Sequence, residues 1–111
     1  MANLEFFMKQ NDTAPSLAIT VLNKSTKLPL SLVGATAKFS MRASGSVVAK
    51  VNGVSADVYD ETGGKVRYNW TASDTDTVGE YEAEFEVTLQ GGGIVTFPQD
   101  GYIKVIVLDD I

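Results

Sequence analysis

Polar and apolar side chains alternate strictly through the stretch Glu80-Tyr81-Glu82-Ala83-Glu84-Phe85-Glu86-Val87-Thr88-Leu89. A helix would scatter the four glutamates around its surface, whereas a strand places all of them on one face. The apolar members of the stretch then share the opposite face. The stretch therefore predicts a strand with one buried face and one solvated face.

The same alternation recurs on both sides of this strand. Ala35 to Arg42 repeats it, and shorter alternating runs occupy Leu17 to Val21 and Val66 to Trp70. Five further strands are expected at Leu4–Lys9, Val47–Val51, Val54–Tyr59, Ile94–Phe97 and Tyr102–Leu108. Turn signals separate these runs at intervals of about 8 to 12 residues, a rhythm typical of a sandwich or barrel. We therefore expect an all-β fold, an immunoglobulin-like antiparallel β-sandwich of about seven to nine strands.

Three turn signals are specific enough to interpret. Asn52-Gly53 predicts a two-residue hairpin between its flanking strands, because both central positions of a type I′ turn need positive φ. Gly91-Gly92-Gly93 is expected at the tip of another hairpin. The segment from Thr71 to Thr77 has room for a single helical turn.

Composition indicates one globular domain spanning residues 1–111, with 44% hydrophobic and 21% charged residues. The net charge is −5, and the nine basic residues are scattered singly, which argues against nucleic acid or an anionic membrane as a partner. A membrane-spanning helix needs roughly 20 apolar residues, and the stretch from Ile103 to Leu108 is short and interrupted by Lys104. The N-terminal residues lack the basic region of a signal peptide, so we expect synthesis and folding in the cytoplasm.

The chain contains neither cysteine nor histidine. It therefore lacks a disulfide, a thiolate nucleophile, the commonest general base and the commonest zinc ligand. We expect that the protein is not an enzyme, that it has no catalytic, cofactor-binding or metal-ligating residues, and that it uses no cofactor.

Tyr81 carries the most specific structural signal. Immunoglobulin-like domains often place a tyrosine near the start of one strand, two residues before a disulfide cysteine, and its hydroxyl bonds back to the preceding corner. Here Ala83 stands at the cysteine position. We expect the Tyr81 hydroxyl to bond to the backbone just upstream.

Several polar motifs have a ligand-binding interpretation that is weaker than the structural one. Asp74 and Asp76 lack the other oxygen ligands and the glycine of a calcium loop, so they are expected to make turn and cap bonds. The acids Asp57, Asp60 and Glu61 are expected at a solvated strand end. The Gly91–Gly93 run resembles a phosphate cradle only in composition, since no helix follows it.

Two motifs could serve carbohydrate chemistry. Trp70 could be a sugar-stacking platform, but its phase with Val66 and Tyr68 favours a core aromatic. Glu82 and Glu84 on one strand face lie roughly 7 Å apart, near the separation in inverting glycosidases. A row of glutamates on a wet face more commonly serves solubility and protection against strand-to-strand association.

Four segments together carry a family resemblance: Leu32–Arg42, Gly64–Trp70, Asp74–Val87, and Thr96–Pro98 with Gly101–Ile103. In this order they resemble the N-terminal domain of the baseplate upper protein family of tailed phages. The resemblance implies an immunoglobulin-like sandwich that docks in a virion, usually in the tail-tip baseplate, where it attaches a receptor-binding arm. Members often continue into a helical linker and further domains, whereas this sequence ends at Ile111. We therefore expect an attachment module without the arm.

The predicted function is that of a structural docking protein in the tail, baseplate or neck of a tailed phage virion. Its expected partners are other phage structural proteins and further copies of itself, with no nucleic acid and no membrane. The alternatives are a host-surface or carbohydrate-binding module, a head decoration protein and a small carboxylate enzyme. The expected contact surfaces are the strand Leu4–Lys9 and the tip Gly91–Gly93.

Overall fold

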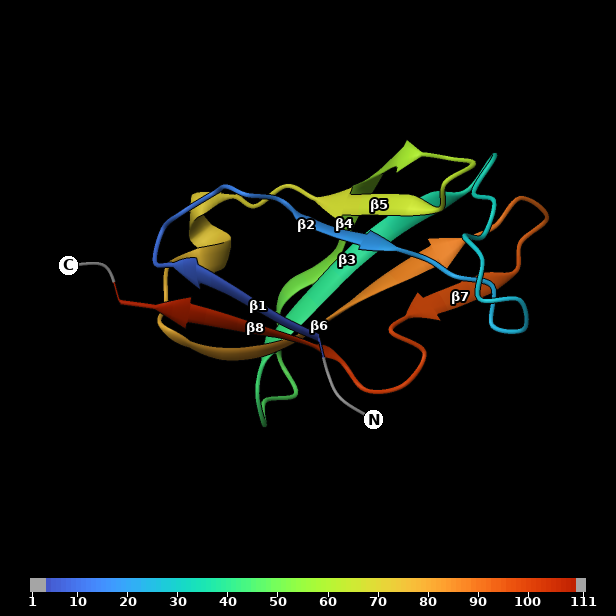
Figure 1. Cartoon of the computed structure of the whole chain (residues 1–111). Coiled ribbons are helices and arrows are strands. Elements are labelled where there is room, and N and C mark those ends of the chain that lie inside the picture. Colours follow the sequence, from blue (N-terminus) through green and yellow to red (C-terminus); the bar gives the residue numbers. More distant parts are fainter. Residues whose placement is uncertain (1–3, 110–111) are drawn as a thin grey trace.

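The computed structural model describes residues 4–109 and is all-β, as predicted (Figure 1). Its strands are β1 (Leu4–Lys9), β2 (Leu17–Thr20), β3 (Thr36–Ala43), β4 (Ala49–Asp60), β5 (Lys65–Tyr68), β6 (Gly79–Thr88), β7 (Ile94–Phe97) and β8 (Ile103–Leu108). A 3₁₀ turn, η1 (Ala72–Thr75), confirms the single helical turn expected there. None of the described residues form a helix long and apolar enough to cross a bilayer.

The strands form one strongly curved sheet in the order β1-β8-β6-β3-β4-β5-β2, with β7 paired to β6 beside this path. All the pairs are antiparallel except β1 with β8, which is parallel. On one edge of β6, residues 79–83 pair with β8 and residues 85–88 pair with β7. Figure 1 shows β2 and β5 lying across the core from β3 and β6. The result is a two-layered, nearly closed β structure.

The prediction of a hairpin turn at Asn52-Gly53 is wrong, because β4 runs through these residues as one strand. The register with β3 shifts there, so that Asn52 and Gly53 together oppose Ser40 in a β-bulge. Gly53 has φ +61°, and its N–H donates to Ser40 Oγ at 2.9 Å. A left-handed glycine suits a bulge as well as a type I′ turn. The bulge bends β4, whose first part pairs with β3 and whose last residues pair with β5.

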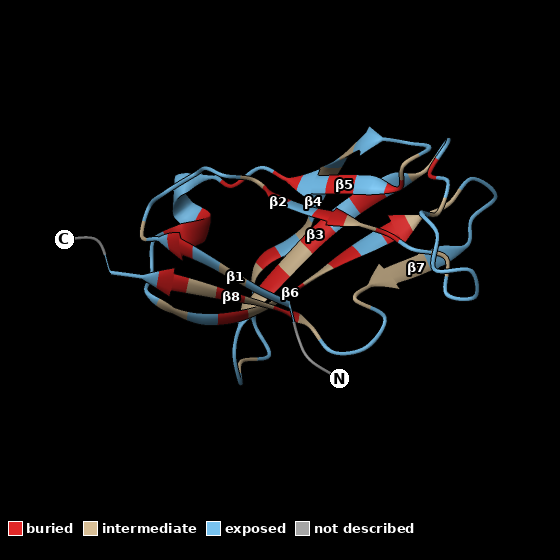
Figure 2. Cartoon of the chain, in the orientation of Figure 1, coloured by how far each residue is buried: buried red, intermediate tan, exposed pale blue. Residues whose placement is uncertain are grey.

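The core is built from the inward faces of the alternating strands, and buried positions form stripes along β3, β6 and β8 in Figure 2. Four aromatic rings meet at its centre. Phe39 stacks on Tyr68 at 4.2 Å between ring centroids and also contacts Phe85 and Trp70. Each such pair contributes about 0.5–1.5 kcal/mol beyond the area that it buries. Trp70 is only 5% exposed, which confirms it as a core aromatic.

The tyrosine predicted to secure the corner before β6 does so. Tyr81 is buried, and its hydroxyl donates to the carbonyl oxygen of Thr77 at 2.6 Å. Ala83, at the position of the absent cysteine, is also buried. This hydrogen bond connects the loop after η1 to β6.

Candidate functional site

The side chain of Asp74 is engaged within the fold. It is nearly buried, and its Oδ2 accepts hydrogen bonds from the Tyr68 hydroxyl at 2.6 Å and from the Thr71 N–H at 2.9 Å. The bond to Thr71 is the cap interaction that the sequence predicted. Burial, together with the hydrogen bond to Asp74, raises the pKa of the Tyr68 hydroxyl above its ordinary range.

Asp76 binds two side chains at the end of the same loop. Its carboxylate lies 2.7 Å from Lys50 Nζ and accepts a hydrogen bond from the Thr77 hydroxyl at 2.9 Å. The hydrogen bond from Lys50 is the main cause that lowers the pKa of this carboxyl, followed by that from Thr77. Over residues 4–109, no three acidic side chains cluster as metal ligands would.

The glutamate row of β6 lies among cations. Glu82 accepts a hydrogen bond from Arg42 Nε at 3.1 Å, and it also stands opposite Lys104 of β8. Alternating charges on neighbouring strands stabilise a sheet face. The hollow beside Glu82 and Glu84, which Tyr102 also lines, holds about 80 Å³. Small-molecule sites typically occupy about 300–1,000 Å³, so this arrangement fits an ion-paired face better than a sugar site.

The acids at the end of β4 have structural partners. Asp57 lies 3.5 Å from Arg67 and accepts a hydrogen bond from the Asn69 side chain at 2.9 Å. Asp60 accepts a bond from the backbone of the following turn, and Glu61 accepts one from the backbone of a distant loop. These side chains therefore organise the turn between β4 and β5.

The Gly91–Gly93 run forms the hairpin tip that was predicted. Gly91 and Gly92 have φ near +98° and +99°, and the Leu89 N–H donates to the Gly93 carbonyl at 2.7 Å. The glycines are exposed at the connection between β6 and β7. The tip is available for contacts but carries no side chains of its own.

Strand β1, the other predicted contact surface, lies at one end of the sheet. Within residues 4–109 it pairs only with β8. Its inward side chains hold it to the core, since Met8 is buried and Phe6 lies 6.0 Å from Trp70 between ring centroids. Phe7 points outward and is 57% exposed. The strand is thus anchored on one face and presents an apolar ring on the other.

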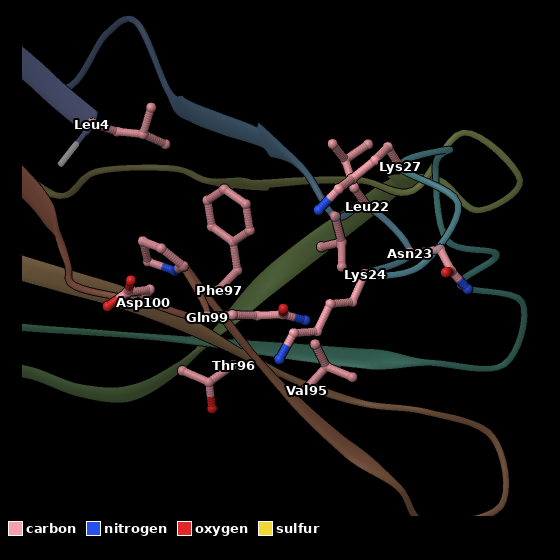
Figure 3. Close-up of a pocket in the computed structure, with 12 residues that line it drawn as sticks. Leu4, Leu22, Asn23, Lys24, Lys27, Val95, Thr96, Phe97, Gln99 and Asp100 are labelled. Atoms are coloured by element: carbon pink, nitrogen blue, oxygen red, sulfur yellow. The ribbon is translucent and has the colours of Figure 1, made fainter. Parts of the chain in front are cut away.

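A third surface was not predicted from the sequence. A groove of about 480 Å³ runs between β7, with the segment that follows it to Asp100, and the segment Val21–Lys27 that follows β2 (Figure 3). Val95 and Phe97 of β7 contribute apolar side chains to it, and Leu4 of β1 also lines it. We call this site the β7 groove. Its size is that of a ligand or peptide site.

The residues of the β7 groove come from three distant parts of the chain, so no spacing in the sequence could reveal it. Two signals were present but ambiguous. Leu22 and Leu28 are apolar residues that follow the predicted strand Leu17–Val21, and both are exposed. Lys24 and Lys27 lie between them in a chain with few basic residues.

The fold and these surfaces define a small β-sandwich whose distinctive features, over residues 4–109, are strand edges without a partner strand, exposed loops and the β7 groove. Comparison with protein families matches residues 3–99 to the BppU N-terminal domain, the N-terminal domain of the phage baseplate upper protein. The chain belongs to this family, which confirms the resemblance seen in its sequence. No curated protein matches the chain at a significant level. Family membership implies a bacteriophage baseplate protein, and hence a virion component with a structural role in the tail.

Proposed function

We propose that this chain is a docking module of a tailed-phage baseplate, which assembles in several copies with other virion proteins. The family match carries this proposal, because it extends over residues 3–99 and therefore covers β1 to β7 rather than a short motif. Attachment to other virion proteins is then a function of this domain itself.

The architecture suits a docking role. Strands β1 and β2 end the sheet without further pairing among the described residues, and unpaired edges are natural sites of association. A rigid aromatic core holds these edges in place at little further entropic cost on binding. Weak contacts at several such surfaces become strong when many copies bind together. The ion-paired outer face of β6 disfavours non-specific association of this face with other proteins.

Other functions have less support. A carbohydrate-binding module needs an exposed aromatic platform, and Trp70 lies in the core. A carboxylate enzyme needs room beside its two acids, and the hollow at Glu82 and Glu84 is small. The hydrogen bond from the Tyr81 hydroxyl to the backbone just upstream supports the immunoglobulin-like character of the sandwich.

Quantitative mass spectrometry of purified particles tests the proposal by counting copies of this chain relative to a tail-tip protein. We expect a ratio that corresponds to a ring of a few to a few tens of copies per particle. Hundreds of copies would instead assign the chain to the capsid surface or tail tube. Absence of the chain from particles would refute a structural role.

A further inference from the structure

We propose that the β7 groove binds an extended acidic segment of a neighbouring virion protein, which adds as a strand to the open edge of β7. This inference rests on the docking function proposed above and specifies the surface and the chemistry of the partner. The partner's backbone would pair with β7, its apolar side chains would enter the groove, and its acidic side chain would meet Lys24 and Lys27.

The first support is the unpaired edge of β7. Within residues 4–109 this strand pairs only with β6, and the backbone bonds made outside the strands involve none of residues 94–97. The Leu89 N–H donates to the Gly93 carbonyl, so the antiparallel alternation turns the polar groups of Val95 toward β6 and those of Ile94 and Thr96 away from it. Two N–H groups and two carbonyls therefore face outward, ready for another strand.

The second support is the apolar surface along that edge. Val95 and Phe97 are only partly covered by the core, and Leu22 on the opposite wall is 42% exposed. Strand addition gains affinity from main-chain hydrogen bonds and specificity from pockets that accept alternate side chains. An open edge beside an apolar groove provides both. The end strand β1 differs, because its neighbouring outward residues Glu5 and Lys9 are charged.

The third support is the charge of the groove. Figure 3 shows Lys24 extending from the Val21–Lys27 segment toward β7, and Lys27 lines the same groove with Leu22 drawn between the two lysines. Neither lysine belongs to the ion pairs found within residues 4–109, and Asp100 is the one acid lining the groove. The groove is thus locally basic in a chain of net charge −5. Complementarity selects an acidic partner, and it disfavours the same groove of a second copy because the lysines would repel each other.

The turn that carries the lysines is already ordered. Asn23 Oδ1 accepts hydrogen bonds from the Ser25 N–H at 2.9 Å and the Thr26 N–H at 3.0 Å, and the Lys27 N–H donates to the Asn23 carbonyl at 2.9 Å. Preorganisation lowers the entropic cost of binding. The basic wall of the groove therefore stands ready before a partner arrives.

Photo-cross-linking in assembled particles tests the inference. Leu22, in the groove wall, is replaced by p-benzoylphenylalanine, and the matched control carries the same substitution at the exposed Val33 outside the groove. We expect Leu22 to cross-link to an Asp- or Glu-containing peptide of another virion protein, and Val33 not to do so. If the chain is present in particles but Leu22 yields no cross-link, or only one to a second copy, the groove inference fails while the docking function stands. If the chain is absent from particles, the docking function itself fails.

The cross-linked peptide, once synthesised, gives a second test with the purified protein. Lys24→Glu combined with Lys27→Glu should weaken its binding by about tenfold or more, whereas Lys9→Glu combined with Lys65→Glu, an equal change of charge elsewhere, should have little effect. Amide exchange adds a readout of strand addition, since bound peptide should slow exchange at Ile94 and Thr96. Equal weakening by both double variants, or unchanged exchange at these two amides, would overturn the proposed mode of binding.

Discussion

The hydroxyl of one buried tyrosine holds the corner before β6. Tyr81 is only 4% exposed, and its Oη lies 2.6 Å from the carbonyl oxygen of Thr77 in a partly buried hydrogen bond. Its removal leaves that carbonyl without its partner. We expect Tyr81→Phe to lower the free energy of unfolding by about 1 kcal/mol, measured by urea denaturation.

Tyr59→Phe is the matched control for Tyr81→Phe. Tyr59 is 42% exposed, and its ring keeps the contact with Arg67, whose guanidinium lies 4.9 Å from the ring centroid. The control should therefore change stability very little. Equal losses in the two variants would contradict the role assigned to the corner.

Tyr68 makes stability sensitive to alkaline pH. Burial and the hydrogen bond to Asp74 raise its pKa above the ordinary value of 10.0. The folded protein therefore keeps a proton that the unfolded chain releases, so this stabilisation is complete below about pH 10 and declines as pH rises toward the folded pKa. We expect Tyr68→Phe to be less stable at neutral pH but to lose less stability above pH 10. Urea midpoints across this range measure the effect, and parallel curves for the two proteins would refute it.

At the scale of elements, the turn between β4 and β5 supports the loop that forms one wall of the groove. The carbonyl of Gly64 accepts a hydrogen bond from the Val21 N–H at 2.8 Å. A Cβ on Gly64 would lie 2.7 Å from the Val21 carbonyl oxygen and 2.8 Å from that of Leu30. Both contacts are with backbone, so an alanine there would force two chain segments apart.

Gly64→Ala should therefore destabilise the protein more than Gly45→Ala. Both glycines have positive φ, +68° and +82°, but a Cβ on Gly45 would meet nothing within 4 Å. The Gly45 variant should cost about 1–2 kcal/mol from backbone strain alone, and the Gly64 variant should cost more because crowding is added. Thermal or urea unfolding provides the comparison. Equal costs would show that the close approach at Gly64 has no energetic consequence.

At the scale of the whole molecule, one core connects both layers of the sheet. The ring of Phe39 on β3 contacts Phe85 on β6 and Tyr68 on β5, so neither layer keeps its buried surface without the other. We expect a single cooperative transition, with Trp70 fluorescence and far-ultraviolet circular dichroism giving the same midpoint. Trp70 is the one tryptophan in the chain and reports on the core directly. Separate midpoints would contradict the expectation of a single domain.

The sequence alone determined the features that depend on short-range patterns. Strict alternation identified the strands around Phe39 and Phe85, because side chains of a strand point to opposite faces whatever its neighbours are. The phase of Trp70 with Val66 placed its ring in the core, and the position of Tyr81 predicted its bond to the corner. The four ordered segments were also sufficient to indicate the family.

Tertiary structure decided the features that depend on which strands meet. A positive φ at Gly53 suits either a hairpin turn or a β-bulge. The bulge is selected because one part of β4 pairs with β3 and the other part pairs with β5. The parallel pairing of β1 with β8 joins the first and last strands, and the β7 groove joins Leu4, the segment Val21–Lys27 and the segment Val95–Asp100. Local periodicity contains no information about such distant partners, because burial of the shared core, rather than any nearby residue, brings them together.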